Sequence, residues 1–334
     1  MHHLITYLAD APWITFNTGA FSDQFWASTF DGLTYGSIYA LVAMGYTLVY
    51  GVLQLINFAH SEVFIVGVYA TVFALNAMGF GPSPVYPPMV VLIIDLLVAM
   101  VAAMIASGLT ALILERVAYR PLRKRNAPRL VFLITAIGAS FTIQYLIFVW
   151  RGGSNAEPAT IMFVPDPVFE VFSTIIDSQQ LTIFIAAIVL MVVTDQFINR
   201  TKFGRGIRAV AQDPDTATLM GVNKERVIML TFVIGGVLAG AAALFYLMKV
   251  PQGASFNGGF VLGIKAFAAA VLGGIGNIRG ALLGGLLLGV VSNYGVTLLG
   301  NSSWTDVVAF VVLVVVLMVR PTGLLGESLG KARV

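Results

Sequence analysis

The sequence predicts an all-α fold, a polytopic membrane helix bundle of about eight to nine transmembrane helices with broken or re-entrant segments. Of the 334 residues, 58% are hydrophobic and only 10% are charged, whereas soluble domains average about 25% charged residues. Apolar stretches also recur along the whole chain, each long enough to cross or nearly cross the hydrocarbon core of a bilayer. They lie at residues 32–54, 58–79, 88–114, 130–150, 181–198, 227–249, 261–276, 281–299 and 304–319.

The first apolar stretch carries small residues every four positions, at Gly32, Gly36 and Ala40. This spacing lets two membrane helices approach closely, so we expect a neighbouring helix against it. Tyr35 and Tyr39 belong to a tyrosine stripe on the same helix. Such a stripe serves helix packing more often than ligand binding, but the two residues are candidates for lining a path through the membrane.

A polar interruption separates the first apolar stretch from the second and contains Asn57, His60 and Glu62. Ionisable residues at membrane depth indicate a functional site by default. The three residues either contact a transported molecule or hold the interruption together, with His60 and Glu62 as a pair. The sequence leaves both interpretations open.

A second stretch, residues 273–289, resembles the first interruption, because it also contains a polar break followed by a helix with spaced small residues, and it includes Gly276 and Gly280. The apolar stretch just before it, 261–276, contains Lys265 and ends in glycines, which predicts a broken or re-entrant helix. Weak internal symmetry with interrupted helices in both halves points to a transport pathway where the halves meet. Each glycine taken singly is more typical of close helix packing.

Basic residues predict the orientation. Of the 19 Lys and Arg, six lie in or beside residues 115–129, six in 199–226 and three in the C-terminal tail. The positive-inside rule makes these three segments cytoplasmic. Nine spans then place the N-terminus outside and the C-terminus inside. We expect residues 1–30 to form an extracytoplasmic or interfacial leader and 31–334 to form one transmembrane domain.

The cytoplasmic segment 201–226 contains a predicted short helix from Pro214 to Met220. Asp213 is suited to cap it, Pro214 to open it, and Gly221 to end it in the left-handed conformation. Two turns do not stand alone in water, so the helix must pack against something. A groove on a partner protein and the lipid headgroups are equally good candidates.

Several motifs are absent from the sequence. There is no P-loop, so this chain does not bind and hydrolyse ATP by that motif, and we predict no enzymatic activity. There is no cysteine and there are only three histidines, which predicts neither a metal site nor a cofactor. A transport subunit with an external motor fits best. A secondary transporter or channel would need paired intramembrane acids or a filter sequence, and a membrane enzyme would need a larger catalytic cluster than His60 with Glu62.

Three stretches of the chain resemble the LivH-type permeases, the membrane subunits of bacterial ABC importers for branched-chain amino acids. They are GSIYALVAMGYTLVYGVLQLINFAH followed by Glu62, GRGIRAVAQDPDTATLMGV, and LGIKAFAAAVLGGIGNIRGALLGGLLLG. The resemblance extends from about Gly32 to Gly326. It implies that segment 201–226 couples to an ATPase subunit through Gln212, Asp213, Pro214, Ala217 and Gly221.

The resemblance also implies an assembly in the bacterial cytoplasmic membrane. Its expected partners are a second homologous permease subunit, two cytoplasmic ATPase subunits, an extracytoplasmic amino-acid-binding protein and membrane lipid, with no nucleic acid. Permeases for urea or short-chain amides share much of the pattern, so they are the alternative on substrate.

Overall fold

The computed structural model describes residues 16–81, 85, 87–152, 166–172, 174–250, 255–320 and 322–326. Its first half consists of α2 (Thr18–Asp23), α3 (Phe25–Leu53), α4 (His60–Ala77), α5 (Met89–Leu114), the π-helical turn η1 (Glu115–Tyr119), α6 (Arg120–Lys124) and α7 (Arg129–Trp150). The second half consists of the antiparallel strands β1 (Pro167–Val171) and β2 (Thr174–Asp177), α8 (Ser178–Arg200), α9 (Lys202–Gln212), α10 (Pro214–Leu219), α11 (Lys224–Lys249), α12 (Gly258–Gly273), α13 (Ile278–Leu299), η2 (Ser302–Trp304) and α14 (Thr305–Val319). Eight helices in this described part are long and apolar enough to cross a membrane, which confirms the predicted polytopic bundle.

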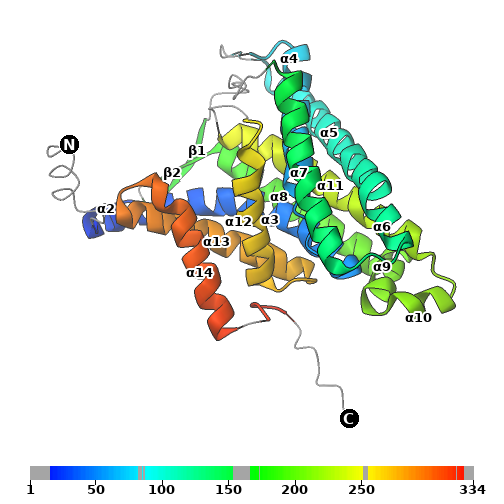
Figure 1. Ribbon diagram of the computed structural model, residues 1–334. Helices are drawn as coiled ribbons and strands as arrows, with labels where there is room; N and C mark the ends of the chain where they lie inside the picture. The colour runs from blue at the N-terminus through cyan, green and yellow to red at the C-terminus, as the bar shows by residue number, and fades with distance from the viewer. Residues whose placement is uncertain are drawn as a thin grey trace, which may run out of the picture.

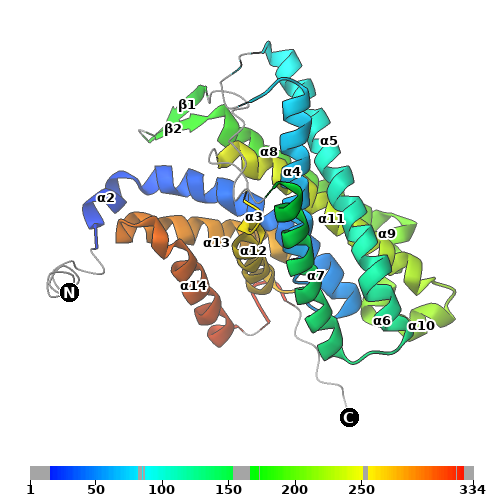
Figure 2. The same cartoon turned by 45° about the horizontal axis from the view of Figure 1, so that its top comes forward.

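Helix α3 is the central element and lies beside α13 (Figure 2). Gly32 of α3 lies against Gly289 and Val290 of α13, and Gly36 lies against Gly285 and Leu286. No side chain separates the two backbones at these points, so the helices approach closely. The small-residue spacing therefore predicted its neighbour correctly.

A second close crossing joins α11 to α5. Gly236 packs against the backbone of Ser107 and Gly108, and one turn later Gly240 packs against Ala103. Because α11 also contacts α3 and α4, this crossing ties α5 to the centre of the bundle. The outward sides of α5 and α14 are apolar and exposed, as expected of surfaces that face lipid.

Two helices begin within the thickness of the bundle. The His60 ring at the start of α4 lies against Gly45 of α3. Gly45 lies eight residues before the end of α3 at Leu53, so α4 begins about 12 Å away from that end, measured along α3. Gly259 at the start of α12 packs against Ile65, about 18 Å short of the far end of α4 at Ala77. With 16 residues, α12 is shorter than a full span, in agreement with the predicted broken or re-entrant helix.

Two apolar helices extend beyond their predicted ends. Helix α3 begins at Phe25, before the expected start at residue 32, and Ser28 and Thr29 in this added part hydrogen-bond to Thr297 and Tyr294 of α13. The helix that begins as α5 continues past the predicted end at residue 114, through η1 and α6 to Lys124. Residues 153–165 lie outside the described residues, and the described chain resumes at Asp166, just before the β1–β2 hairpin that leads into α8.

Several ion pairs join neighbouring apolar helices in the described part of the chain. Lys265 of α12 contacts Asp306 of α14 at 2.5 Å, and Lys249 of α11 contacts Asp31 of α3 at 2.5 Å. Arg279 of α13 forms a two-point contact with Asp195 of α8 at 2.9 and 3.2 Å. An unpaired charge is costly in a membrane, so these contacts join helices as well as neutralise the side chains.

The close α3–α13 crossing predicts that an alanine at Gly285 destabilises the subunit. A Cβ at Gly285 would lie 2.6 Å from the backbone of Ala40, which cannot move aside as a side chain can, so Gly285→Ala should destabilise the subunit by about 1–3 kcal/mol. The matched control is Gly138→Ala in α7, where nothing lies within 4 Å of the added methyl group. Thermal unfolding of the purified subunit in detergent measures both, and equal midpoints for the two variants would contradict the packing argument.

Candidate functional site

Glu62 lies where the two interrupted helices meet and has an exposed fraction of 0%. Its Oε1 atom accepts hydrogen bonds from Gln144 Nε2 at 2.8 Å, from Ser140 Oγ at 3.2 Å and from Ser61 Oγ at 3.2 Å. Its Oε2 atom has no hydrogen-bond partner among the described residues. A Cβ on Gly259 would lie 3.2 Å from Oε2, so this oxygen faces the first turn of α12. The site is a buried carboxylate with one oxygen held by three donors and the other left for a further contact.

His60 does not form the predicted pair with Glu62. Its ring instead makes an edge-to-face contact with Tyr46 of α3, with 4.8 Å between ring centroids, and its Nε2 atom has no partner in the described part of the chain. Helix geometry explains the difference, because residues two positions apart do not share a face. His60 and Glu62 therefore belong to one helical turn but to different contacts.

Asn57, the third residue of the predicted site, is held from outside the interruption. The hydroxyl of Tyr119, in η1, donates a hydrogen bond of 2.7 Å to Asn57 Oδ1, and both side chains are buried. The Asn57 carbonyl in turn accepts the backbone N–H of His60 at 3.1 Å. Asn57 thus joins η1 to the start of α4.

The two candidate tyrosines lie apart from Glu62, in the half of α3 remote from the interruption. Lys249 Nζ lies 5.6 Å from the ring centroid of Tyr35, and Lys265 Nζ lies 5.9 Å from that of Tyr39. These are cation–π distances. Tyr35 and Tyr39 therefore form a separate aromatic and cationic cluster.

The candidate glycines Gly276 and Gly280 also lie away from Glu62. Gly276 lies in the turn between α12 and α13 and has φ 96°. It is close to the end of α3, because a Cβ on Gly51 would lie 4.0 Å from the Cα of Gly276, whereas Gly280 packs against Gly273. Glu62 instead lies beside Gly259 at the start of α12, which the sequence analysis did not single out, and Gly263 of the same helix packs against Ser61.

Sequence analysis missed Ser140 and Gln144, the two α7 residues that bind Glu62. Both are buried, and their spacing of four places them on one face of α7. That spacing inside an otherwise apolar stretch was a detectable signal. Their partner was not detectable, because it lies about eighty residues away along the chain.

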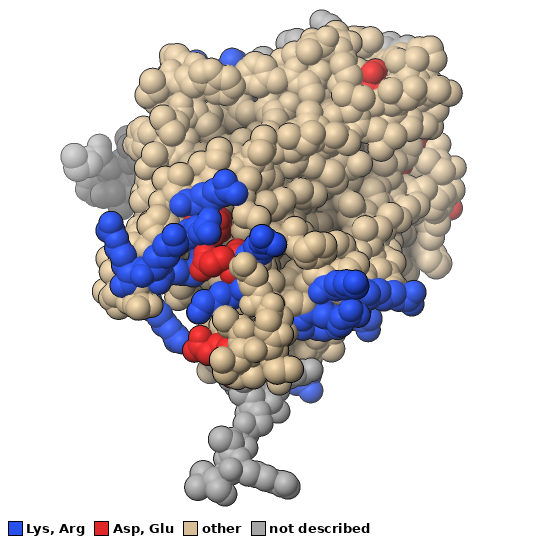
Figure 3. All heavy atoms as spheres, turned by 90° about the vertical axis from the view of Figure 1, so that its right-hand side faces the viewer, with Lys and Arg blue, Asp and Glu red and all other residues tan. Residues whose placement is uncertain are grey.

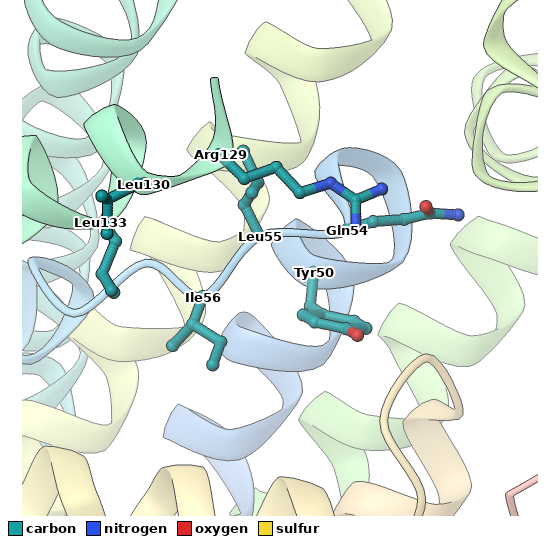
Figure 4. A pocket seen from close by; sticks show the side chains of 7 residues that line it. All are labelled: Tyr50, Gln54, Leu55, Ile56, Arg129, Leu130 and Leu133. Atoms are coloured by element: carbon teal, nitrogen blue, oxygen red, sulfur yellow. The ribbon is translucent and has the colours of Figure 1, made fainter. Parts of the chain in front are cut away.

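An open pocket of about 370 Å³ adjoins the interruption (Figure 4). Its walls come from the end of α3, the interruption and the start of α7, and Arg129 extends toward Gln54 across it. Gln54 has φ 53°, a left-handed conformation that ends α3. The lining residues are Tyr50, Gln54, Leu55, Ile56, Arg129, Leu130 and Leu133.

Helices α9 and α10 project at the end of the molecule where Lys and Arg side chains gather (Figures 1 and 3). Asp213 caps α10 as predicted, accepting the backbone N–H of Asp215 at 2.9 Å and of Thr216 at 3.1 Å. Helix α9 ends at Gln212, so Asp213 is the single residue between α9 and α10, and Pro214 is the first residue of α10. Gly221 lies just beyond the end of α10 and has φ 86°.

Ala217, one of the residues that the resemblance assigns to coupling, is not part of the exposed face of α10. Ala217 is only 3% exposed, because it packs against its own chain, where its carbonyl accepts the N–H of Val222. Leu219 and Met220 are 87% and 81% exposed. Two large apolar side chains so exposed on a short helix indicate a surface that a partner or lipid covers.

Comparison with known proteins places the chain among permeases. A family model described as branched-chain amino acid transport system / permease component matches residues 28–317. The high-affinity branched-chain amino acid transport system permease protein BraD of Pseudomonas aeruginosa is 42% identical over 304 residues, covering 89% of this chain and 94% of the relative. The corresponding LivH proteins of Salmonella typhimurium and Escherichia coli K12 are 41% and 40% identical with the same coverage.

The Asp213 cap predicts a pH dependence. Its hydrogen bonds from the Thr216 hydroxyl and from the backbone N–H groups of Thr216 and Asp215 hold the pKa of the Asp213 carboxyl below its usual value. The cap therefore stabilises α10 above the unfolded pKa of about 3.9 and is lost as the pH falls through the lower folded pKa.

At neutral pH, Asp213→Ala should speed hydrogen exchange at the Asp215 and Thr216 amides several-fold, because the cap is lost. Asp213→Asn retains the acceptor and is the control. Unchanged exchange in the alanine variant would show that the cap does not hold the helix.

Proposed function

The chain belongs to the family of branched-chain amino acid transport system permease components, and from this premise we propose that it is the membrane subunit of an ABC importer for leucine, isoleucine and valine. The relatives are named as high-affinity branched-chain amino acid permeases, which supports the substrate, and the match over most of the chain supports the class. In this proposal ATP hydrolysis resides in two separate cytoplasmic subunits. A second homologous permease subunit and an extracytoplasmic binding protein complete the assembly.

The single observation that carries the proposal is the exposed face of α10. A two-turn helix is held rigidly by its cap and by packing on α9 and α11, yet presents Leu219 and Met220 to the outside. Such a helix suits docking into a groove on a motor subunit. Gln212, Asp213, Pro214 and Gly221 set its geometry, and Ala217 fastens it to the rest of the permease.

The orientation follows from the basic residues. Helices α6 and α9, with their Lys and Arg side chains, would face the cytoplasm under the positive-inside rule, and α10 lies beside α9 on the same face. The N-terminus then lies outside and the C-terminus inside, in the bacterial cytoplasmic membrane. The open pocket lined by Arg129 lies on the cytoplasmic side of the interruption in this orientation.

We propose the meeting point of α4 and α12 as the site where the substrate passes. The free Oε2 of Glu62 is an acceptor for the ammonium group of an amino acid, while the rings of Phe58 and Phe267, 6.2 Å apart, offer apolar surface for a branched side chain. Because Glu62 is buried, access requires α12 or α7 to move. Alternating movement driven by the ATPase subunits would open the site to one side at a time.

Labelled leucine uptake tests the function. Vesicles carrying the whole complex, with binding protein outside, should accumulate leucine when ATP is inside and not when it is absent. Labelled urea is the second substrate in the same vesicles, because the alternative on substrate is urea or a short-chain amide. Uptake of urea in place of leucine would overturn the substrate, and uptake without ATP would overturn the importer.

Cross-linking tests the coupling surface, and the absence of native cysteine makes single-cysteine variants clean. Leu219→Cys and Met220→Cys should cross-link to a cysteine in the ATPase subunit, because both side chains are exposed. Ala217→Cys is the matched control on the same helix and should react poorly, because Ala217 is 3% exposed. A working complex in which neither exposed position cross-links would contradict docking through α10.

A further inference from the structure

The π-helical turn η1 lies inside one continuous helix of 36 residues, Met89–Lys124. The backbone N–H of Arg120 bonds to the carbonyl of Glu115, five residues earlier, where an α-helix would use four. Pro121 explains the position, because proline has no N–H and an α pattern would require it to donate to Val117. Single π turns within α-helices are frequent at functional sites.

One side of η1 is tied to segment 201–226. Glu115 is 1% exposed and pairs with Arg123 Nη2, and the same nitrogen contacts Glu225 Oε2 at 2.9 Å. Arg120 Nε lies 3.3 Å from that oxygen. Glu225 is the second residue of α11, directly after α10 and its short connection. A movement of this connection is therefore transmitted to two carboxylates and two guanidinium groups at η1.

The other side of η1 is tied to the candidate site. Tyr119 is 0% exposed, and its ring packs between Phe132 of α7 and Phe232 of α11, with centroids 6.2 and 5.2 Å away. Its hydroxyl therefore cannot turn away without repacking both neighbours, and it holds Asn57 at 2.7 Å. Asn57 precedes Glu62 by five residues, and its carbonyl accepts the N–H of His60, which lies between them.

The ion cluster leaves part of its bonding capacity unused. Among the described residues, Glu115 Oε2 and the Nε and Nη1 atoms of Arg123 are buried without hydrogen-bond partners. Buried polar atoms without hydrogen-bond partners raise the free energy of the arrangement seen here. The same atoms are available to form hydrogen bonds in a second arrangement of the cluster. A shift of the π turn by one residue along the helix would move these atoms relative to one another and relative to Glu225.

We propose that Glu225, Arg123, Glu115 and Tyr119 are positioning residues for transport, which link movement of segment 201–226 to Asn57 and so to Glu62. The inference rests on the proposed function, because it assumes that ATPase subunits move α10. The four side chains do not contact the substrate. They set the position of the interruption before α4 according to the state of the motor.

The test uses the whole complex in vesicles and measures two quantities, stimulated ATP hydrolysis and leucine uptake. Tyr119→Phe removes a single hydroxyl, and Glu225→Gln removes a single charge. Each should lower leucine transported per ATP hydrolysed about tenfold, the size of a typical coupling effect, while ATP hydrolysis continues. The double variant should be no worse than the more affected single one, because both changes interrupt the same connection.

Matched controls are available for both changes. Tyr145→Phe removes the hydroxyl of a tyrosine that is 60% exposed on α7. Glu170→Gln removes the charge of an exposed glutamate in β1, away from α10, η1 and Glu62. Neither should change the ratio of transport to hydrolysis.

The outcomes separate the two proposals. If uptake and hydrolysis fall together in Tyr119→Phe and Glu225→Gln, or if neither variant changes the ratio, the positioning role is wrong although the wild-type complex transports leucine. If the wild-type complex itself takes up no leucine with ATP, the proposed function is wrong and this inference falls with it.

Discussion

Lipid offers the backbone no hydrogen-bond partners, and this constraint governs how the two interrupted helices are accommodated. Irregular backbone at membrane depth is tolerated only where protein surrounds it. The part of the interruption next to α4 is buried, and its polar groups are satisfied by the Tyr119 hydroxyl, which bonds to Asn57, and by backbone turns at the Asn57 and Ala59 carbonyls. Enclosing it requires the surrounding helices to approach closely. That explains the glycines at the α3–α13 and α5–α11 crossings, where backbones touch without side chains between them.

The low polarity of lipid also explains how the charged side chains are arranged. Three ion pairs among the described residues join α3 to α11, α12 to α14 and α8 to α13, which neutralises these side chains and helps to fix how the helices lie together. Glu62 is different, because its three partners are neutral donors and one oxygen stays free. A carboxylate surrounded only by neutral groups is suited to receive a cationic group that arrives and leaves.

The two proposed functional regions are the buried site at Glu62 and the exposed face of α10, and η1 lies between them. The helix that carries η1 is long, about 54 Å, so its last turns leave the membrane and reach segment 201–226. This geometry explains why an ion cluster at a basic surface and a tyrosine deep in the bundle belong to one helix. In an importer whose motor is a separate subunit, such a helix would connect segment 201–226, which the motor moves, to the buried site at Glu62, which must open.

The sequence by itself determined the features that depend on near neighbours in the chain. Hydrophobic length set the spans, the small residues of α3 predicted a close partner, and Asp213, Pro214 and Gly221 specified α10, because caps and turns use groups only a few residues apart. Only the tertiary structure decided which distant residues meet. Ser140 and Gln144 reach Glu62, Gly259 replaces Gly276 as the glycine beside it, and Ala217 turns inward while Leu219 and Met220 stay exposed. Each of these depends on how helices pack across long separations, and periodicity along one helix does not specify the face of another that it meets.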